Sequence, residues 1–455
     1  MAVPAPAWRP RDTSPVPRMF PWQTVGVLVT TACLAMYLWL WIGARKPVGA
    51  GLVLIPLLLL MSAPVIARAA RREATFDLAG LLVTALSLRF ICSYLRFANA
   101  ADALEYFTEG TRLATSFRAL HFDVETGRPV PGTGTVRYLT GLVNAVTFSN
   151  RMATTLVFAW FGFWGIYLMY RALVMAVPDA DRYRYARFVC LWPSLCFWPS
   201  TIGKEACLIF TLGVASLGAA RVFTRRPGGY ILMITAIAAA SFVRPHIAML
   251  TLIAFVIALF VGTRHAPTSD AKTPASIAKV AALVVLIAVG SLFASRTADF
   301  FGTSDLSPSS IDTVLSKTTE QTSQGGSAFT PTSALTPQGY AVAFVTILVR
   351  PFPIEAHGAE ELLSAAEGLV LAGLIIASWR RLATVPRRMR AQPYVGFAFV
   401  FVFMFVFMFA SIANFGILAR QRTQVLPFAF VLLCIPLATR ARATGARRGA
   451  PAATA

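Results

Sequence analysis

The stretch that decides the fold is residues 395–413, VGFAFVFVFMFVFMFASIA, which contains no charged side chain. Residues 51–67, GLVLIPLLLLMSAPVIA, form a second uncharged run. About 20 helical residues cross the hydrocarbon core of a bilayer, and a helix satisfies its own backbone hydrogen bonds there. Phenylalanine alternates from Phe397 to Phe409 as in a strand, but the length of the run indicates a transmembrane helix whose rings face lipid and neighbouring helices. The sequence therefore predicts an all-α, polytopic membrane protein.

The composition of the whole chain agrees with this class. Of its 455 residues, 56% are hydrophobic and only 13% are charged, well outside the range of soluble proteins. The formal net charge of +21 could suggest nucleic-acid binding, but Lys and Arg gather in short clusters between apolar runs, as membrane topology requires. The sequence has no zinc-ligand spacing and no RNA-binding signature. We therefore exclude nucleic acid as a partner.

Cysteines and the N-terminal residues add no further chemistry. All six cysteines fall inside apolar runs without metal-motif spacing, which is typical of small packing residues and not of disulfides. Arg9, Arg11 and Arg18 precede the first apolar run, but no small-residue cleavage site follows. This pattern indicates an uncleaved anchor.

Apolar runs predict about twelve transmembrane spans. Basic clusters follow every even-numbered span, which places both termini in the cytoplasm. Residues 1–22 are then a cytoplasmic tail, residues 23–438 a single transmembrane domain and residues 439–455 a basic cytoplasmic tail. The predicted spans are residues 23–43, 48–67, 77–96, 153–173, 186–199, 205–222, 229–243, 247–262, 277–295, 360–379, 395–413 and 425–438.

Two of the predicted outer loops are long. Residues 97–151 are punctuated by glycine and proline, with a short helix expected around residues 100–120. Residues 296–359 open with a loop-like tract rich in Ser, Thr and Gly. The apolar residues 340–349 that follow are too few to span, and we expect an interfacial or re-entrant helix near residues 340–350.

Unusual polar residues gather on the predicted outer side. Outer loops normally lack Lys and Arg, so cations there suggest binding of a phosphate or pyrophosphate. A carboxylate nearby could take a proton from a sugar hydroxyl, and Asp102, Glu105 and Glu205 are the candidates, with Asp102 preferred. The candidate substrate-binding residues are Tyr106, Lys204, Arg244, His246, Arg350, Glu355, Asn414, Arg420 and Arg422.

Plainer roles are open for several of these residues. Lys204 and Glu205 could simply cap a helix, and Arg350 could pair with Glu355 to fix a loop. Two further charges, Arg89 and Glu367, lie deep inside predicted spans, where ionisable groups are costly and usually paired or functional. We hypothesise that Arg89 and Glu367 approach each other or line a polar cavity, with a structural ion pair as the simpler alternative.

The outer motifs resemble bacterial multi-pass glycosyltransferases of the GT-C superfamily and the related Wzy-type, O-antigen polymerase-like polysaccharide polymerases. The resemblance rests on Asp102 with Tyr106, Phe197-Trp198 with Gly203-Lys204-Glu205, Arg244-Pro245-His246, and the stretch from Asn414 to Arg422. It implies a bacterial cytoplasmic-membrane enzyme that takes a saccharide from a polyprenyl phosphate or pyrophosphate at the extracytoplasmic face and passes it to a glycan or lipid-linked acceptor. By position, the acidic residue of an early outer loop corresponds to Asp102, which here follows the third span and not the first.

The sequence leaves other functions open. A transporter or flippase for a lipid-linked or anionic solute is one alternative, and a non-catalytic subunit of an envelope-polysaccharide assembly complex is another. No cofactor is firmly implied. A divalent metal is compatible with the implied enzyme class, but the sequence has no paired-acid motif suited to one.

Overall fold

The computed structural model describes residues 20–43, 47–262, 319–320, 322–323, 328–332 and 334–436, without the side chains of Asn99 and Ala101. Every regular element in these ranges is a helix, and one isolated bridge joins Ala328 to Asn414. The helices are α1 (Trp22–Ile42), α2 (Ala50–Ala70), α3 (Leu78–Asn99), α4 (Ala101–Arg118), α5 (Thr133–Val146), α6 (Arg151–Ala176), α7 (Arg182–Leu191), α8 (Pro193–Phe197), α9 (Lys204–Phe223), α10 (Gly229–Val243), α11 (Pro245–Val261), α14 (Pro337–Leu348), the 3-10 helix η1 (Pro353–Glu355), α15 (Ala359–Ala377), α16 (Trp379–Leu382), α17 (Val385–Ala391), α18 (Pro393–Phe409) and α19 (Phe415–Leu433).

Five of the described helices, α1, α2, α3, α6 and α9, are long and apolar enough to cross a membrane. Four shorter apolar helices, α10, α11, α14 and α18, accompany them. The all-helical class is thus confirmed, and the five candidate spans agree with a membrane protein. The count of twelve spans stays a prediction. The predicted span 277–295 lies outside the described residues.

Three local predictions differ from the structure. The predicted span 186–199 is broken, because Trp192 takes an extended conformation (ψ 123°) before Pro193 and separates α7 from α8. The last outer turn, 414–422, is helical from Phe415 onward, so the final helix begins ten residues before the predicted residue 425. In the predicted loop 97–151, α4 matches the expected short helix and α5 is an addition.

Close backbone contact holds α6 against α9. A Cβ atom added to Gly165 would lie 2.3 Å from the carbonyl oxygen of Ile209, and one added to Gly213 would lie 2.3 Å from that of Gly165. Small residues at such positions let helices pack tightly where water provides little driving force for association. This contact fixes the start of α9, which carries Lys204 and Glu205.

The phenylalanine-rich run forms α18 as predicted, and its rings separate into two sets. Phe401, Phe405 and Phe409 stack in sequence along one side, with centroids 6.2 and 4.1 Å apart, and all three are buried. Phe399 and Phe403 face outward and are 38% and 45% exposed. The rings of this run therefore divide into a packing set and an outward-facing set.

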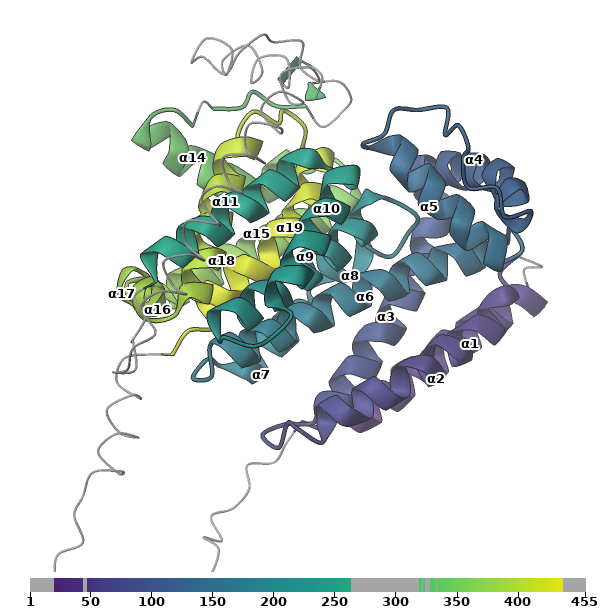
Figure 1. Ribbon diagram of the computed structural model, residues 1–455, viewed down its shortest axis with the longest axis horizontal. Coiled ribbons are helices and arrows are strands. Elements are labelled where there is room, and N and C mark those ends of the chain that lie inside the picture. Colours follow the sequence, from purple (N-terminus) through teal and green to yellow (C-terminus); the bar gives the residue numbers. More distant parts are fainter. Residues whose placement is uncertain are drawn as a thin grey trace, which may run out of the picture.

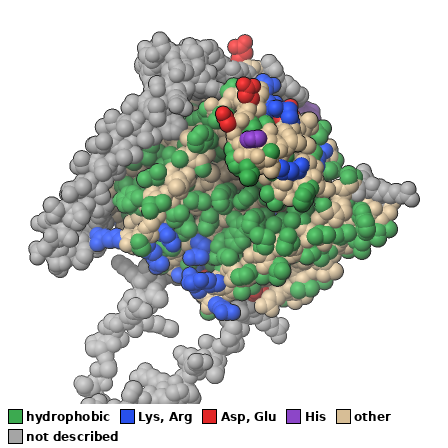
Figure 2. Space-filling view, turned by 45° about the vertical axis from the view of Figure 1, so that its right-hand side comes forward, with side chains coloured by type: hydrophobic (Ala, Val, Ile, Leu, Met, Phe, Trp, Pro, Cys, Tyr) green, Lys and Arg blue, Asp and Glu red, His purple; other side chains and the backbone are tan. Residues whose placement is uncertain are grey.

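Charged side chains gather at two ends of the helix bundle. At one end, Arg184 binds the hydroxyl of Ser378, Arg381 binds the carbonyl of Ile435 and Arg388 pairs with Asp179. We call it the basic end. Figure 1 shows α16 and α17 at the left and the α4–α5 hairpin at the upper right. In Figure 2, Lys and Arg gather along the lower left edge, acidic residues and further Lys and Arg lie near the top, and mainly hydrophobic side chains lie between these two regions. We call the end of the bundle that carries the α4–α5 hairpin the hairpin end.

Candidate functional site

A group of charged residues from five parts of the chain meets at the hairpin end. α3 contributes Arg96 and α4 contributes Asp102, while α9 contributes both Lys204 and Glu205. Arg244 lies between α10 and α11, and Arg420 comes from α19. We call these six residues, Arg96, Asp102, Lys204, Glu205, Arg244 and Arg420, the charge cluster.

Glu205 is the buried centre of the charge cluster. Its side chain is 3% exposed, and its Oε1 atom lies 3.4 Å from a terminal nitrogen of Arg244 and 3.5 Å from Nε of Arg420. Glu205 also lies in the first turn of α9, where the helix dipole favours a negative charge. Glu205 can therefore stabilise the start of α9 and also form the centre of the charge cluster.

Asp102 is the exposed carboxylate of the cluster. Both terminal nitrogens of Arg420 donate to Oδ2 of Asp102 at 3.1 Å. The Asp102 side chain is 59% exposed, in contrast to 3% for Glu205. Its second oxygen, Oδ1, accepts no hydrogen bond from any described residue. A group arriving from solvent can reach this oxygen without breaking the contact with Arg420.

Trp198 lies between two guanidinium groups. The Cζ atom of Arg96 is 4.7 Å from the centre of the Trp198 ring, and that of Arg420 is 5.8 Å from it. Arg96 also stacks on Phe197 at 5.0 Å. Each of these contacts is a cation–π interaction, which orients the cation while leaving its hydrogen-bond donors free.

Arg96 and Lys204 are the two cations of the cluster without a polar partner. Arg96 is only 6% exposed, its Nε is buried without a hydrogen bond, and it forms no ion pair with a described residue. Lys204 is half-buried, and it too makes no hydrogen bond or ion pair within the described ranges. Its charge does interact over a longer range with Arg244, Glu205 and Asp102. Unpaired buried cations are costly, so this arrangement favours an anionic ligand.

Two glutamines of α19 hold Arg244 in place. Arg244 donates to Oε1 of Gln421, which also accepts a 2.7 Å hydrogen bond from Nε2 of Gln424. Both glutamines are buried. His246 lies beside this network, with its ring 5.7 Å from that of Phe409 and its electrostatic neighbours Arg244 and Lys204. The predicted residues Arg244 and His246 thus lie at the charge cluster.

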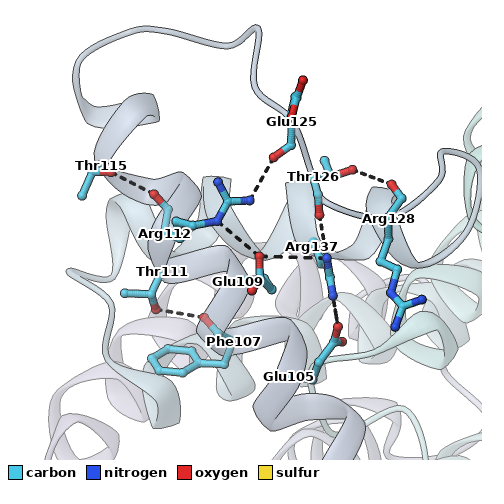
Figure 3. Close-up of polar contacts among 10 residues, drawn as sticks. All are labelled: Glu105, Phe107, Glu109, Thr111, Arg112, Thr115, Glu125, Thr126, Arg128 and Arg137. Atoms are coloured by element: carbon cyan, nitrogen blue, oxygen red, sulfur yellow. Dashed lines mark hydrogen bonds and ion pairs between the residues drawn. The ribbon is translucent and has the colours of Figure 1, made fainter.

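Glu105 belongs to a different network on the same hairpin (Figure 3). Arg137 of α5 donates from Nε to Oε1 of Glu105 at 3.0 Å and from a terminal nitrogen to the carbonyl of Thr126 at 2.7 Å. A further ion pair joins Arg137 to Glu109. Glu105 therefore ties α4 to α5. Tyr106 instead packs beneath the hairpin, where burial raises the pKa of its phenol.

Four other predicted site residues form a separate group. Arg350 stacks on Phe415 at 5.0 Å and pairs with Glu355, whose pKa this hydrogen bond lowers. Arg422 donates to the carbonyls of Ile347 and Arg350, and Asn414 caps α19 by accepting from the amide of Ile417. Arg420 and Arg422 lie two residues apart on a helix, about 200° around its axis, which places them in different groups. These contacts support the alternative that Arg350 pairs with Glu355 to fix a loop.

Arg89 and Glu367 bind the same helix break and not each other. Arg89 donates to the carbonyls of Cys190 at 3.3 Å and Leu195 at 3.4 Å. Glu367 accepts from the amide of Ser194 at 2.5 Å. No ion pair joins the two residues within the described part of the chain, so the alternative of a structural ion pair is wrong, whereas the hypothesis that they approach each other or line a polar cavity stays a prediction. Together they satisfy backbone groups that the break between α7 and α8 leaves without helical partners.

Arg96, Trp198, Gln421 and Gln424 were missing from the predicted site. One signal for Arg96 was in the sequence, since it ends the predicted span 77–96 on the outer side, where arginine is disfavoured. The glutamines gave no comparable signal. Among the described residues, no group of three or more His, Cys, Asp or Glu side chains could hold a metal ion.

Comparisons with known proteins identify no family for this chain. No family model matches the chain, and no curated protein or solved structure shows significant similarity to it.

Proposed function

We propose that this protein is an integral membrane glycosyltransferase or polysaccharide polymerase that uses a polyprenyl phosphate- or pyrophosphate-linked saccharide at the extracytoplasmic face. One observation carries the proposal: Arg96 and Lys204 lack polar partners in the described structure, next to the exposed carboxylate of Asp102. The cations provide a place for the phosphate of a donor. The carboxylate provides a base for an acceptor.

The charge balance supports an anionic substrate. Arg96, Lys204, Arg244 and Arg420 contribute four positive charges, and Asp102 and Glu205 contribute two negative ones, which leaves an excess of two positive charges if all six are ionised. Guanidinium groups bind phosphate oxygens in bidentate fashion and an ammonium binds them as a point charge. A phosphate or pyrophosphate link would neutralise this excess.

The proposed reaction needs one base and one stabilised leaving group. Asp102 accepts the proton of an acceptor hydroxyl through its open Oδ1 atom as the hydroxyl oxygen attacks the anomeric carbon of the donor sugar. The bond between that carbon and the phosphate oxygen breaks, and its electron pair stays on the phosphate. Arg96 and Lys204 stabilise the charge that develops there.

Glu205 takes a positioning role in this proposal. It is buried and already contacts Arg244 and Arg420, so it orients these two cations instead of acting as a base. Glu105 is occupied by Arg137 and takes no part. The proposal routes no step through a metal ion, because Arg420 already occupies the space between the two carboxylates and would repel a second cation.

Mass spectrometry of polyprenyl-linked saccharides in cells with and without the gene tests the proposal. We expect a donor or repeat unit to accumulate without the gene, and to return to normal with wild type but not with Asp102→Asn. Asp179→Asn is the matched control, because Asp179 is an exposed, arginine-paired aspartate at the basic end. Unchanged lipid-linked pools and envelope glycans would contradict the proposal and favour a transporter or a non-catalytic subunit.

A further inference from the structure

An aromatic groove lies where α7 passes the start of α1, and none of its lining residues belongs to the charge cluster. Its volume is about 390 Å3. The lining residues are Phe20, Trp22, Tyr183, Arg187, Phe188, Leu191 and Trp192. All but Arg187 are apolar or aromatic, so the groove suits a hydrocarbon chain.

The walls of the groove are held by specific contacts. Nε1 of Trp22 donates to the hydroxyl of Tyr183 at 3.2 Å, which joins α1 to α7. Behind the groove, Phe430 of α19 packs on Phe188 and on Trp192, each at 5.0 Å between ring centroids. The groove is therefore formed by packed residues from three helices.

Among the lining residues of this groove, Arg187 is the one cation. Arg187 is exposed, stacks on Tyr183 at 4.6 Å and forms no hydrogen bond or ion pair with a described residue. It follows Arg184, which lies at the basic end, by one turn of α7. From Arg187 to Trp192 the chain rises roughly 7 Å, so Leu191 and Trp192 lie farther from the start of α7 than the cation does.

We propose that this groove binds one anionic phospholipid of the bilayer. Its phosphate pairs with the guanidinium of Arg187, and one acyl chain lies along Phe188, Leu191 and Trp192. The charge of Arg187 selects an anionic head group over a zwitterionic one, since only the anionic head group carries a net negative charge that the guanidinium can neutralise. Aromatic side chains beside the head group are typical of the membrane interface. This site does not depend on the function proposed for the charge cluster.

Native mass spectrometry of the full-length protein, titrated with phosphatidylglycerol or with phosphatidylcholine of the same acyl chains, tests the proposal. We expect one tightly bound phosphatidylglycerol and at least tenfold weaker binding of phosphatidylcholine. Arg187→Gln should weaken the phosphatidylglycerol complex at least tenfold. Arg226→Gln, a change at another exposed arginine, should leave it unchanged.

A second variant separates loss of the site from loss of the fold. Leu191→Trp fills the apolar part of the groove and keeps Arg187, so it should also release the lipid while the protein remains folded. Equal binding of the two lipids, or wild-type binding by Arg187→Gln, would overturn the proposal. So would stronger lipid binding after deletion of residues 1–19, since that result would assign the groove to the preceding segment of the chain.

Discussion

The guanidinium of Arg420 binds the carboxylate of Asp102 with both of its terminal nitrogens, each 3.1 Å from Oδ2. The two residues are 318 positions apart in the sequence, and the same guanidinium reaches the buried Glu205 through Nε. Arg420 therefore connects the exposed carboxylate of the charge cluster to its buried centre. It also fixes the direction in which the open oxygen of Asp102 points.

Asp102→Asn should lower saccharide transfer on the order of 100-fold or more, because an amide cannot accept the proton of the acceptor hydroxyl. The side chain keeps its shape and can still accept a hydrogen bond from Arg420, so the folded protein should be recovered in normal yield. Turnover of a purified lipid-linked saccharide measures the effect. Wild-type turnover by this variant would remove Asp102 from the mechanism.

Arg96→Gln should weaken binding of an anionic substrate and raise its KM, and it should also lower kcat because Arg96 stabilises the leaving phosphate. Arg96 offers unpaired donors beside Trp198, and a charge-assisted hydrogen bond contributes about 1.5–3 kcal/mol. The assay is the dependence of transfer rate on donor concentration. Arg112→Gln is the control, because Arg112 is exposed and binds Glu109 and the carbonyl of Glu125, outside the charge cluster. Equal KM values for the two variants would argue against a phosphate contact at Arg96.

Exchanging the charges of Arg89 and Glu367 should not rescue the stability lost in either single variant. Each side chain binds backbone groups around α8, and a carboxylate cannot donate to the carbonyls that Arg89 serves. Leaving one buried polar group unsatisfied costs about 1–3 kcal/mol, so Arg89→Met and Glu367→Leu should both lower the melting temperature in detergent. Recovery of that temperature in the exchanged double variant would restore the direct-pair hypothesis.

Gly165→Ala should destabilise the protein by about 1–3 kcal/mol, because the added methyl group collides with the carbonyl of Ile209 in α9. Gly373→Ala is the matched control. It places the same methyl group on a helix where no neighbouring atom lies within 4 Å, and replacing glycine by alanine in a helix is intrinsically favourable. Thermal unfolding of the two variants should therefore shift in opposite directions or leave Gly373→Ala unchanged.

The pair of Arg350 and Glu355 gives a stability that depends on pH. Its hydrogen bond lowers the pKa of Glu355 in the folded state, so the contribution is present above the ordinary glutamate pKa and disappears as pH falls through the lowered value. Because the pair is partly exposed, we expect only about 0.5 kcal/mol. The melting temperatures of wild type and Glu355→Gln should differ at pH 7 and converge below about pH 4. A constant difference over this range would show that the ionised pair is not its source.

The local pattern of the sequence determined the helical class and several helix positions. Uncharged runs of about twenty residues can only satisfy their backbone groups as helices in lipid, and the predicted range 229–243 matches α10 at both ends. The position of charges also separated the residues of the two ends of the bundle, since Lys and Arg are distributed unequally across a membrane. These properties depend on residues that lie close together in the sequence.

Tertiary structure alone decided which charges meet. Asp102 and Glu105 are three residues apart and were both candidate bases, with Asp102 preferred, yet one reaches Arg420 and the other Arg137. Arg420 and Arg422 differ in the same way, because a helix turns neighbouring side chains toward different partners. Arg89 and Glu367 each bind backbone groups at the break between α7 and α8. The residues that surround Arg89 and Glu367 in the sequence do not reveal this break. A buried charge takes the partner that the folded helices bring within reach, and that partner is set by packing between segments far apart in the chain.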